Sequence, residues 1–339
     1  MTGSVDTLAG VVPVVPASLT WRDRVGGYRV RWGIGRYTFL VDPGLYAVGT
    51  TDDRSPVLVT ANYKLSFDAL RRHLAGRDAW LLALDTRGVN VWCAAGKGTF
   101  GTEEVVRRVD ASALAQIVSH GTLVLPQLGA PGVSAAEVRR RTGFRAVWGP
   151  VQAAALPEFL DAGMRATPEM RRIRFPLKDR LVLVPVELTA VVVIALLITL
   201  SAAAVAAFVG RGFAVANSLA ALLPAAVIVL ATVKAGAILT PILLPWLPPR
   251  MFAAKGALVG FVVALLVLPW FTGVLHPLQL EASALFMIAG SSFIAMNFTG
   301  TSTFTSLSGV KREMSAWLPW QIGASALAAV LWIARGFIA

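Results

Sequence analysis

The chain has 339 residues, of which 56% are hydrophobic, and its formal net charge is +12. So high an apolar content excludes an ordinary soluble protein, and a single cysteine excludes an internal disulfide and an iron–sulfur cluster held by this chain alone. Of the 31 Lys and Arg residues, 24 lie before residue 181. The same holds for 16 of the 19 Asp and Glu residues. We therefore expect a soluble domain over residues 1–165, a basic linker over 166–180 and a membrane domain over 181–339.

The start of the chain lacks a basic segment followed by a long apolar core, so we expect no cleaved signal peptide. Residues 21–47 then alternate polar and apolar side chains around VGGYRVRWGIGRYTFLVDPGLY. This alternation predicts a β-hairpin or a small meander, with Gly33 and Gly35 near a turn.

From residue 56 onward, short apolar runs alternate with helical patterns. The runs predict strands at 56–60, 79–86, 89–94, 122–126 and 146–151. The helical patterns lie at 66–75, 102–109, 111–119 and 133–141. Apolar strands separated by helices predict a Rossmann-like α/β domain with a parallel sheet covered on both faces.

Ligands of such sheets bind at the carboxyl ends of the strands, where loops gather. Four segments occupy those ends and are rich in Gly, Pro, Thr and Asn: TANYKLSFD (60–68), NVWCAAGKGTF (90–100), LPQLGAPG (125–132) and WGPV (148–151). This composition is expected where loops crowd around a large flat ligand.

The single thiol, Cys93, stands where the predicted strand 89–94 runs into a helical segment. One interpretation is a small apolar residue buried at a strand end. The other is a reactive thiolate, because Lys97 and a helix N-terminus both stabilise the charged form. Small neighbours at Ala94, Ala95 and Gly96 would let a bulky group approach the sulfur. Composition and position leave both interpretations open.

The second half of the chain contains five apolar runs that are long enough to cross a bilayer, which needs about 20 residues. We place them at 181–209, 213–245, 252–272, 280–300 and 315–338. The second run is too long for one straight helix. Pro241, Pro245, Pro248 and Pro249 should divide it into a span and a re-entrant or interfacial tail.

Loop charges predict the orientation, because basic residues are retained on the cytoplasmic side. Basic residues lie before the first span and in the second and fourth connections: Arg171, Arg172, Arg174, Lys178, Arg180, Arg250, Lys255, Lys311 and Arg312. The first connection has only Arg211, the third has no basic residue, and the C-terminal tail has Arg335. This predicts a multi-pass protein of the cytoplasmic (inner) membrane, with the soluble domain cytoplasmic and the C-terminus extracytoplasmic. Because much of the positive excess lies beside the membrane, we expect lipid and no nucleic acid as a partner.

Lys234 is a charged residue inside the second predicted span. It either marks a span end, from which the amine reaches the interface, or belongs to a site within the bundle. The sequence does not decide between these roles.

The stretch NVWCAAGK (90–97) resembles the signature of the mercury-methylating corrinoid proteins. Further stretches are similar to that family: VDPGLYAVG (41–49), PVLVTANYKLSFDALR (56–71), WCAAGKGTFGTEE (92–104), LVLPQLGAPGV (123–133), WGPV (148–151) and NFTGTSTFTSLSGVK (297–311). The soluble part also resembles the corrinoid-binding domain of the large subunit of the corrinoid iron–sulfur protein. That subunit carries cluster cysteines that this chain lacks.

The resemblance implies a corrinoid cofactor of the cobalamin type whose cobalt is ligated on its lower face by the Cys93 thiolate. It also implies a methyltransferase activity, in which a methyl group passes from cobalt to Hg(II) and forms methylmercury. A histidine motif of the D-x-H-x-x-G type has no counterpart, since the closest match around His73 has Arg71 in the Asp position. The family pattern and the loops predicted at the strand ends suggest these corrinoid contacts: Thr60, Ala61, Asn62, Tyr63, Asn90, Val91, Trp92, Cys93, Ala94, Ala95, Gly96, Lys97, Thr99, Phe100, Gln127, Leu128, Gly129, Ala130, Pro131, Gly149, Pro150 and Val151. The helix beginning near Thr102 is expected behind Cys93.

The single cysteine also predicts partners. With no second thiol for Hg(II), the chain would need a ferredoxin-like iron–sulfur protein, which the resemblance also implies, as reductant and Hg(II) carrier. A C1 methyl donor system would supply the methyl group. Two alternatives remain open: a membrane-anchored corrinoid methyl carrier of C1 metabolism with another acceptor, and a membrane transporter or anchor with a regulatory head.

Overall fold

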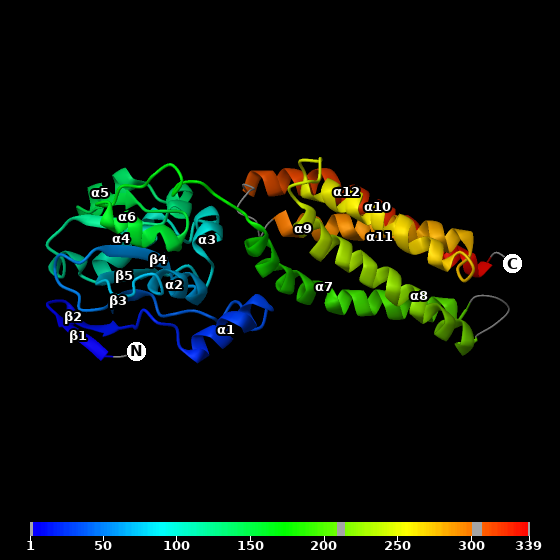
Figure 1. Ribbon diagram of the computed structural model, residues 1–339, viewed down its shortest axis with the longest axis horizontal. Coiled ribbons are helices and arrows are strands. Elements are labelled where there is room, and N and C mark those ends of the chain that lie inside the picture. The colour runs from blue at the N-terminus through cyan, green and yellow to red at the C-terminus, as the bar shows by residue number, and fades with distance from the viewer. Residues whose placement is uncertain (1–2, 209–213, 300–306, 338–339) are drawn as a thin grey trace. The chain divides into compact units, whose positions relative to one another are not determined.

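The structure is a computed structural model that describes residues 3–208, 214–299 and 307–337. The chain divides into two compact units, an N-terminal unit (Met1–Arg174) and a C-terminal unit (Phe175–Ala339) (Figure 1). The N-terminal unit is a mixed α/β domain and the C-terminal unit is helical, so the predicted fold class is confirmed. Arg211, used for the orientation, and residues 300–306, within the last stretch that resembles the family, lie outside the described residues.

A seven-stranded sheet forms the centre of the N-terminal unit, in the order β1-β2-β3-β5-β4-β6-β7. The strands are β1 (Gly3–Thr7), β2 (Gly10–Val14), β3 (Gly44–Val48), β4 (Val57–Ala61), β5 (Ala79–Leu84), β6 (Thr122–Leu125) and β7 (Arg145–Trp148). Strands β5, β4, β6 and β7 are parallel, as predicted. The other half of the sheet is not wholly parallel, because β3 runs antiparallel to β5, and β1 antiparallel to β2.

Helices cover both faces of this sheet. One apolar core joins it to α1 (Trp21–Arg31), α3 (Val91–Lys97), α4 (Thr102–Ala111) and α5 (Ala135–Thr142). A second core joins the opposite face to α2 (Lys64–Arg71) and α6 (Leu156–Asp161). Strands β4 and β5 are buried along their whole length, which explains their continuous apolar sequences.

The hairpin predicted over residues 21–47 is wrong. The segment forms helix α1 followed by turns, and only β3 at its end is a strand. Thr20 and Asp23 explain the helix, because the Thr20 hydroxyl accepts from the Asp23 N–H while the Asp23 carboxylate accepts from the Thr20 N–H. This reciprocal cap satisfies two N–H groups at the helix start.

The strand predicted at 89–94 is also wrong, because residues 91–97 form the short helix α3. The Asn90 side chain begins this helix by accepting a hydrogen bond of 2.9 Å from the Cys93 N–H. The helix expected at 111–119 is reduced to the 3₁₀ helix η1 (Leu114–Gln116). Cys93 therefore lies in the first turn of a helix of its own, separate from the helix that begins at Thr102.

The C-terminal unit contains five helices that are long and apolar enough to cross a membrane, among the described residues. They are Leu177–Ala206, Val215–Leu243, Phe252–Phe271, Pro277–Phe298 and Ser308–Ala334. They correspond to α7 (Leu177–Ala206), α8 (Val215–Lys234) continued by α9 (Thr240–Leu243), α10 (Phe252–Val267) continued by η5 (Leu268–Phe271), α11 (Pro277–Thr299) and α12 (Leu307–Ala334). The last helix begins several residues before the predicted start at 315.

The helix of the second span passes Pro241 but ends before Pro245, Pro248 and Pro249, so three of the four prolines follow its end. The helix continues through a π-helical segment, Ala235–Leu239, and ends after Pro241 at Leu243. A proline has no N–H for the carbonyl one turn earlier, so the looser π segment accommodates Pro241. The Ala235 carbonyl accepts the Thr240 N–H and also the Thr240 hydroxyl, the latter at 2.7 Å. Lys234, the last residue of α8, has an exposed side chain.

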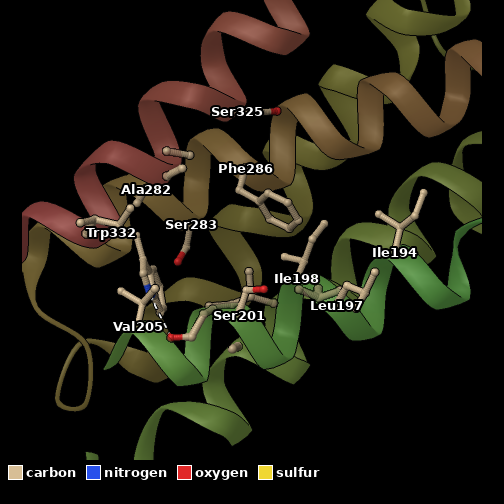
Figure 2. Close-up of a pocket in the computed structure, with 17 residues that line it drawn as sticks. Ile194, Leu197, Ile198, Ser201, Val205, Ala282, Ser283, Phe286, Ser325 and Trp332 are labelled. Carbon is tan, nitrogen blue, oxygen red and sulfur yellow. Dashed lines mark hydrogen bonds between the residues drawn. The ribbon is translucent and has the colours of Figure 1, made fainter. Parts of the chain in front are cut away.

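An apolar groove of about 480 Å³ lies between α7 and α12, with α8 and α11 as its floor (Figure 2). Trp332 closes it by donating to the Ala202 carbonyl on α7, at 3.4 Å. The Ser283 hydroxyl in its floor donates to the Gln279 carbonyl at 2.6 Å. The groove therefore offers a surface for hydrocarbon and little for polar chemistry.

Candidate functional site at the carboxyl ends of the strands

Four parallel strands end together at one edge of the sheet. Because β4, β5, β6 and β7 run in the same direction, Ala61, Leu84, Leu125 and Trp148 finish on the same side. The segments that follow these residues form the candidate site. The loops that sequence reasoning singled out are thus neighbours, as expected for a parallel sheet.

Asn62 ties the end of β4 to the loop that follows β5. Its side-chain oxygen accepts from the Thr86 N–H at 3.0 Å, the Thr86 hydroxyl at 2.9 Å and the Gly88 N–H at 3.2 Å. The Val89 carbonyl lies 2.7 Å from the same Thr86 oxygen, so the single hydroxyl proton is shared between Asn62 and Val89. These bonds fix the approach to α3, so Asn62 holds the loop in place.

Helix α3 presents the thiol. Cys93 is partly exposed, whereas the following Ala94 and Ala95 are buried. Lys97 lies four residues after Cys93, which places both residues on one face of the helix. Gly98 ends the helix in a left-handed conformation.

The 3₁₀ helix η2 (Gln127–Gly132), which follows β6, packs directly against α3. A Cβ at Gly132 would overlap the Phe100 carbonyl oxygen and lie 3.1 Å from the Ala95 Cα. Gly132 therefore permits a backbone-to-backbone approach that no larger residue would allow. The approach brings the loop after β6 beside the helix that carries Cys93.

Two buried polar atoms at this edge have no hydrogen-bond partner among the described residues: the hydroxyl oxygen of Tyr63 and Oε1 of Gln127. They follow β4 and β6, which are adjacent strands. Buried polar groups in native proteins are nearly always paired with protein, water or ligand, so these two atoms are candidate points of contact for a ligand at this edge. Burial raises the pKa of Tyr63, against the lowering influence of Arg36 and Arg31, so its hydroxyl keeps its proton and can donate.

The same electrostatic environment identifies neighbours that sequence reasoning missed. The positive charges of Arg36 and Arg31, which were not among the predicted site residues, influence the pKa of Tyr63. The turn after α1 reaches this edge through a bridge between Leu40 and Tyr63. No local motif announces this contact, because the turn and the strand meet only in the folded chain.

The candidate contacts differ in how accessible they are. Those buried are Thr60, Ala61, Asn62, Tyr63, Ala94, Ala95, Phe100, Gly129, Gly149 and Pro150. Those partly exposed are Asn90, Val91, Trp92, Cys93, Thr99, Gln127, Leu128, Ala130 and Val151, and those exposed are Gly96, Lys97 and Pro131. Only the latter two sets offer much side-chain surface to a ligand, and the buried residues shape the loops behind it.

The three histidines lie elsewhere. His73 follows α2 and His120 precedes β6, which places both at the amino edge of the sheet, and His276 precedes α11 in the other unit. Burial, together with Arg72, lowers the pKa of His73. No group of three or more His, Cys, Asp and Glu side chains is placed to hold a metal ion within residues 3–208, 214–299 and 307–337. Cys93 is thus the one soft metal ligand that the described residues offer at this edge.

Comparison with known proteins places the candidate site within a region of recognised similarity. Residues 35–160 match the family of the CO dehydrogenase/acetyl-CoA synthase delta subunit. The chain is 36% identical over 123 residues to subunit gamma of the acetyl-CoA decarbonylase/synthase complex of Methanopyrus kandleri, covering 36% of this chain and 26% of that protein. The gamma subunit of Methanothermobacter thermautotrophicus is 32% identical over 123 residues, with the same coverage of both chains. Gamma subunit 2 of Methanosarcina thermophila is 33% identical over 125 residues, again covering 36% and 26%. The chain thus spans about a quarter of the length of these relatives.

Proposed function

We propose that the N-terminal unit binds a corrinoid at the carboxyl edge of its sheet, with the Cys93 thiolate as the lower ligand of cobalt, and that the protein transfers a methyl group to Hg(II). The observation that carries this proposal is the position of Cys93. It is a partly exposed thiol on a helix that packs against the loop after β6 and also contacts β4.

The residues at the edge fit a large ligand with many polar substituents. The unpaired Tyr63 hydroxyl is a donor and the unpaired Gln127 oxygen is an acceptor. Ala94, Ala95 and Gly96 follow the thiol and have little bulk. The chain offers one soft ligand here. This suits a metal whose other ligands come from a cofactor, as in the cobalt of a corrinoid.

Each element of the edge has a distinct role in this proposal. Asn90 orients the first turn of α3 through its bond to the Cys93 N–H and so fixes the direction of the thiol. Asn62 holds the preceding loop, and Gly132 allows η2 to close against α3. The corrinoid, when bound, supplies cobalt that accepts and donates the methyl group, and a thiolate is a stronger electron donor to it than an imidazole.

Mercury as the acceptor rests on the resemblance of NVWCAAGK to the mercury-methylating corrinoid proteins. Hg(II) is an electrophile and requires a methyl group with carbanion or radical character. A strongly donating lower ligand favours that character. The choice of a thiolate in place of a histidine is therefore linked to the substrate.

Partners follow from the same chemistry. With Cys93 bound to cobalt, the chain has no second cysteine for Hg(II). We propose a ferredoxin-like iron–sulfur protein as reductant and Hg(II) carrier, together with a C1 methyl donor system. Residues 1–165 would form the cytoplasmic corrinoid-binding domain, 166–180 a basic linker and 181–339 a domain in the inner membrane with the C-terminus outside.

A second candidate has support of its own. Residues 35–160 are similar to subunits of acetyl-CoA decarbonylase/synthase complexes. The names of these relatives refer to acetyl-CoA chemistry and not to mercury. A membrane-anchored corrinoid methyl carrier with a different acceptor fits that similarity equally well. The two candidates share the cofactor and differ only in the acceptor.

Two measurements test the proposal in order. The full chain, purified from cells that make corrinoid, should contain cobalt in equal amount, and a chain without cobalt would contradict both methyl-transfer candidates. Cells that express the chain with a ferredoxin-like partner should convert isotopically labelled Hg(II) to methylmercury. A chain that binds cobalt but forms no methylmercury would favour the carrier with another acceptor.

A further inference from the structure

The outward face of α1 carries three exposed aromatic side chains. Trp21 is 76% exposed, Tyr28 is 64% exposed and Trp32 is 48% exposed. Their spacing of seven and four residues places them in one row along the helix. Large exposed aromatic residues gathered on one face indicate an interaction surface.

Arginines border this row on both sides. Helical spacing places Arg22 and Arg29 along one side and Arg24 and Arg31 along the other. None of these four forms an ion pair within the described part of the chain. We call Trp21, Tyr28, Trp32 and these four arginines the aromatic–arginine face.

The opposite side of α1 fastens the helix to the domain. Asp23 bonds to Lys64 Nζ at 2.6 Å and to Arg71 at 2.8 Å, both on α2. Gly26 allows a close approach to Phe39, since a Cβ there would lie 2.6 Å from the Phe39 ring. Asp23, the acidic residue of α1, is thus turned inward. Its bonds to α2 and the packing of Gly26 on Phe39 leave the aromatic–arginine face on the outer side of the helix.

The turn after α1 extends this surface towards the candidate site. Ile34 is 54% exposed and Tyr37 is 79% exposed. Arg31, Arg36 and Tyr37 lie near enough to Tyr63 to influence its pKa. A partner bound to the aromatic–arginine face would therefore lie beside the rim that contains Tyr63 and Cys93.

We propose that the aromatic–arginine face docks onto the anionic surface of a lipid bilayer. Trp and Tyr rings favour the headgroup region of a membrane, where one end of the ring is apolar and the other is wet. Arginine guanidinium groups pair with phosphate through two parallel hydrogen bonds. The charge of the face is complementary to anionic lipid, which attracts basic segments close to a membrane.

The chain itself supplies the reason to choose lipid over an acidic protein. It contains five helices fit to cross a membrane, and residues 175–176 connect them to the N-terminal unit. This tether keeps the face at a high effective concentration relative to the bilayer. An acidic protein would have to be recruited from solution.

The experiment uses the full chain in nanodiscs and a fluorophore on the proposed face. In a Cys93→Ser background, Tyr28→Cys carries an environment-sensitive NBD label, and Arg140→Cys, an exposed position on α5, is the matched control. The nanodiscs contain phosphatidylcholine alone or with phosphatidylglycerol, with a spin-labelled lipid as quencher. With phosphatidylglycerol, emission from position 28 should shift to the blue and be quenched, whereas emission from position 140 should not change.

Changing Arg22, Arg24, Arg29 and Arg31 together to Gln, or raising the salt concentration, should abolish the shift because the attraction is electrostatic. A label at position 28 that reports the same environment in both lipids would overturn the proposal. So would a response to poly-L-glutamate, as a mimic of an acidic protein, without a response to lipid. Quenching of native tryptophan fluorescence by brominated phosphatidylglycerol, compared between the wild-type chain and its Trp21→Phe/Trp32→Phe variant, repeats the test with Cys93 intact. A wild-type chain quenched no more than the variant would also overturn the proposal.

Discussion

In the C-terminal unit, Arg180 and Ser291 bond to backbone carbonyls of neighbouring helices, although Arg180 Nε and Gln321 Oε1 have no partner among the described residues. At the strand edge of the N-terminal unit, the Tyr63 hydroxyl and Gln127 Oε1 make no hydrogen bond among the described residues. Arg180 on α7 donates to the carbonyls of Pro241 and Ile242 at 2.7 and 2.9 Å. Ser291 on α11 donates to the Thr232 carbonyl on α8 at 3.1 Å. The hydroxyl oxygen of Tyr63 and Oε1 of Gln127, by contrast, are buried atoms without a partner among the described residues.

Under the proposed function, side chains such as Arg180 and Ser291 hold helices together, whereas Tyr63 and Gln127 are polar groups that a ligand would pair. A polar side chain bonded across helices stabilises their packing, and its removal leaves buried backbone carbonyls without donors. An open polar atom already carries the penalty of burial, so its removal should stabilise the fold or leave it unchanged. Its presence is explained if a ligand supplies the partner.

The largest effect is expected at Arg180. Arg180→Ala would leave two buried carbonyls unpaired and should destabilise the C-terminal unit by about 3 kcal/mol, from the usual contribution of hydrogen bonds to charged groups. The apparent unfolding temperature of the full chain in detergent measures this loss. Arg250→Ala, which removes an exposed arginine of the same unit, should change little. Equal losses in the two variants would remove the distinction between bonded and open polar groups.

A bonded group in the N-terminal unit should behave in the same way. Burial alone would raise the pKa of Asp23, but hydrogen bonds from Lys64, Thr20 and Arg71 hold that pKa far below its ordinary value of 3.8. The unfolded chain therefore binds this proton more tightly, so the stabilisation is complete above about pH 5 and is lost as the pH falls through and below 3.8.

Asp23→Asn should lower the unfolding free energy of the N-terminal unit by about 2 kcal/mol at pH 7 and reduce its dependence on pH between about 5 and 2. Denaturant unfolding monitored by tryptophan fluorescence across this range gives the measurement. Asp161→Asn, which disrupts an exposed pair with Arg77, is the control and should have little effect. An Asp23→Asn variant with an unchanged pH profile would contradict the network.

An intermediate loss of stability is expected where η2 packs closely against α3. Gly132→Ala should force η2 away from α3 and destabilise the N-terminal unit by about 1–3 kcal/mol. Gly44→Ala is the matched control, since a Cβ there meets no atom within 4 Å. Corrinoid affinity should fall in the first variant and remain in the second. If Gly132→Ala binds corrinoid normally, the close approach of η2 to α3 does not shape the site.

The smallest stability effect, and the sharpest contrast, is expected at Tyr63. Tyr63→Phe should leave stability unchanged or raise it by less than about 1 kcal/mol, and should weaken corrinoid binding by about fivefold to tenfold. Tyr46→Phe provides the opposite case, because the Tyr46 hydroxyl donates to the Asp42 carbonyl at 2.7 Å. That variant should lose about 1 kcal/mol and bind corrinoid normally. A reversed pattern would contradict the interpretation of the open hydroxyl.

The sequence predicted the five helices fit to cross a membrane from their long apolar runs, and the parallel strands from short apolar runs that alternate with helical patterns. It failed at α1, where alternating residues imitate a strand and the decisive signal is the cap formed by Thr20 and Asp23. It failed again at α3, where Asn90 begins a seven-residue helix that is too short to show a period.

The site was predicted in the same uneven way. Loops after the strands were identified because topology alone brings them together. Arg31 and Arg36 were missed because they reach Tyr63 only through the folded turn after α1. Asn62 was proposed as a contact, but its oxygen is engaged by Thr86 and Gly88, a use that sequence spacing does not reveal.

The central claim is that the Cys93 thiolate binds cobalt, and X-ray absorption at the cobalt edge of the corrinoid-loaded full chain tests it most directly. The wild-type spectrum should contain a sulfur ligand that is absent from Cys93→Ala and Cys93→Ser, although both variants still bind corrinoid through the loops. Cys93→His should show a nitrogen ligand instead, since imidazole is a recognised metal ligand. A wild-type spectrum without sulfur, or one identical to that of Cys93→Ala, would contradict the claim.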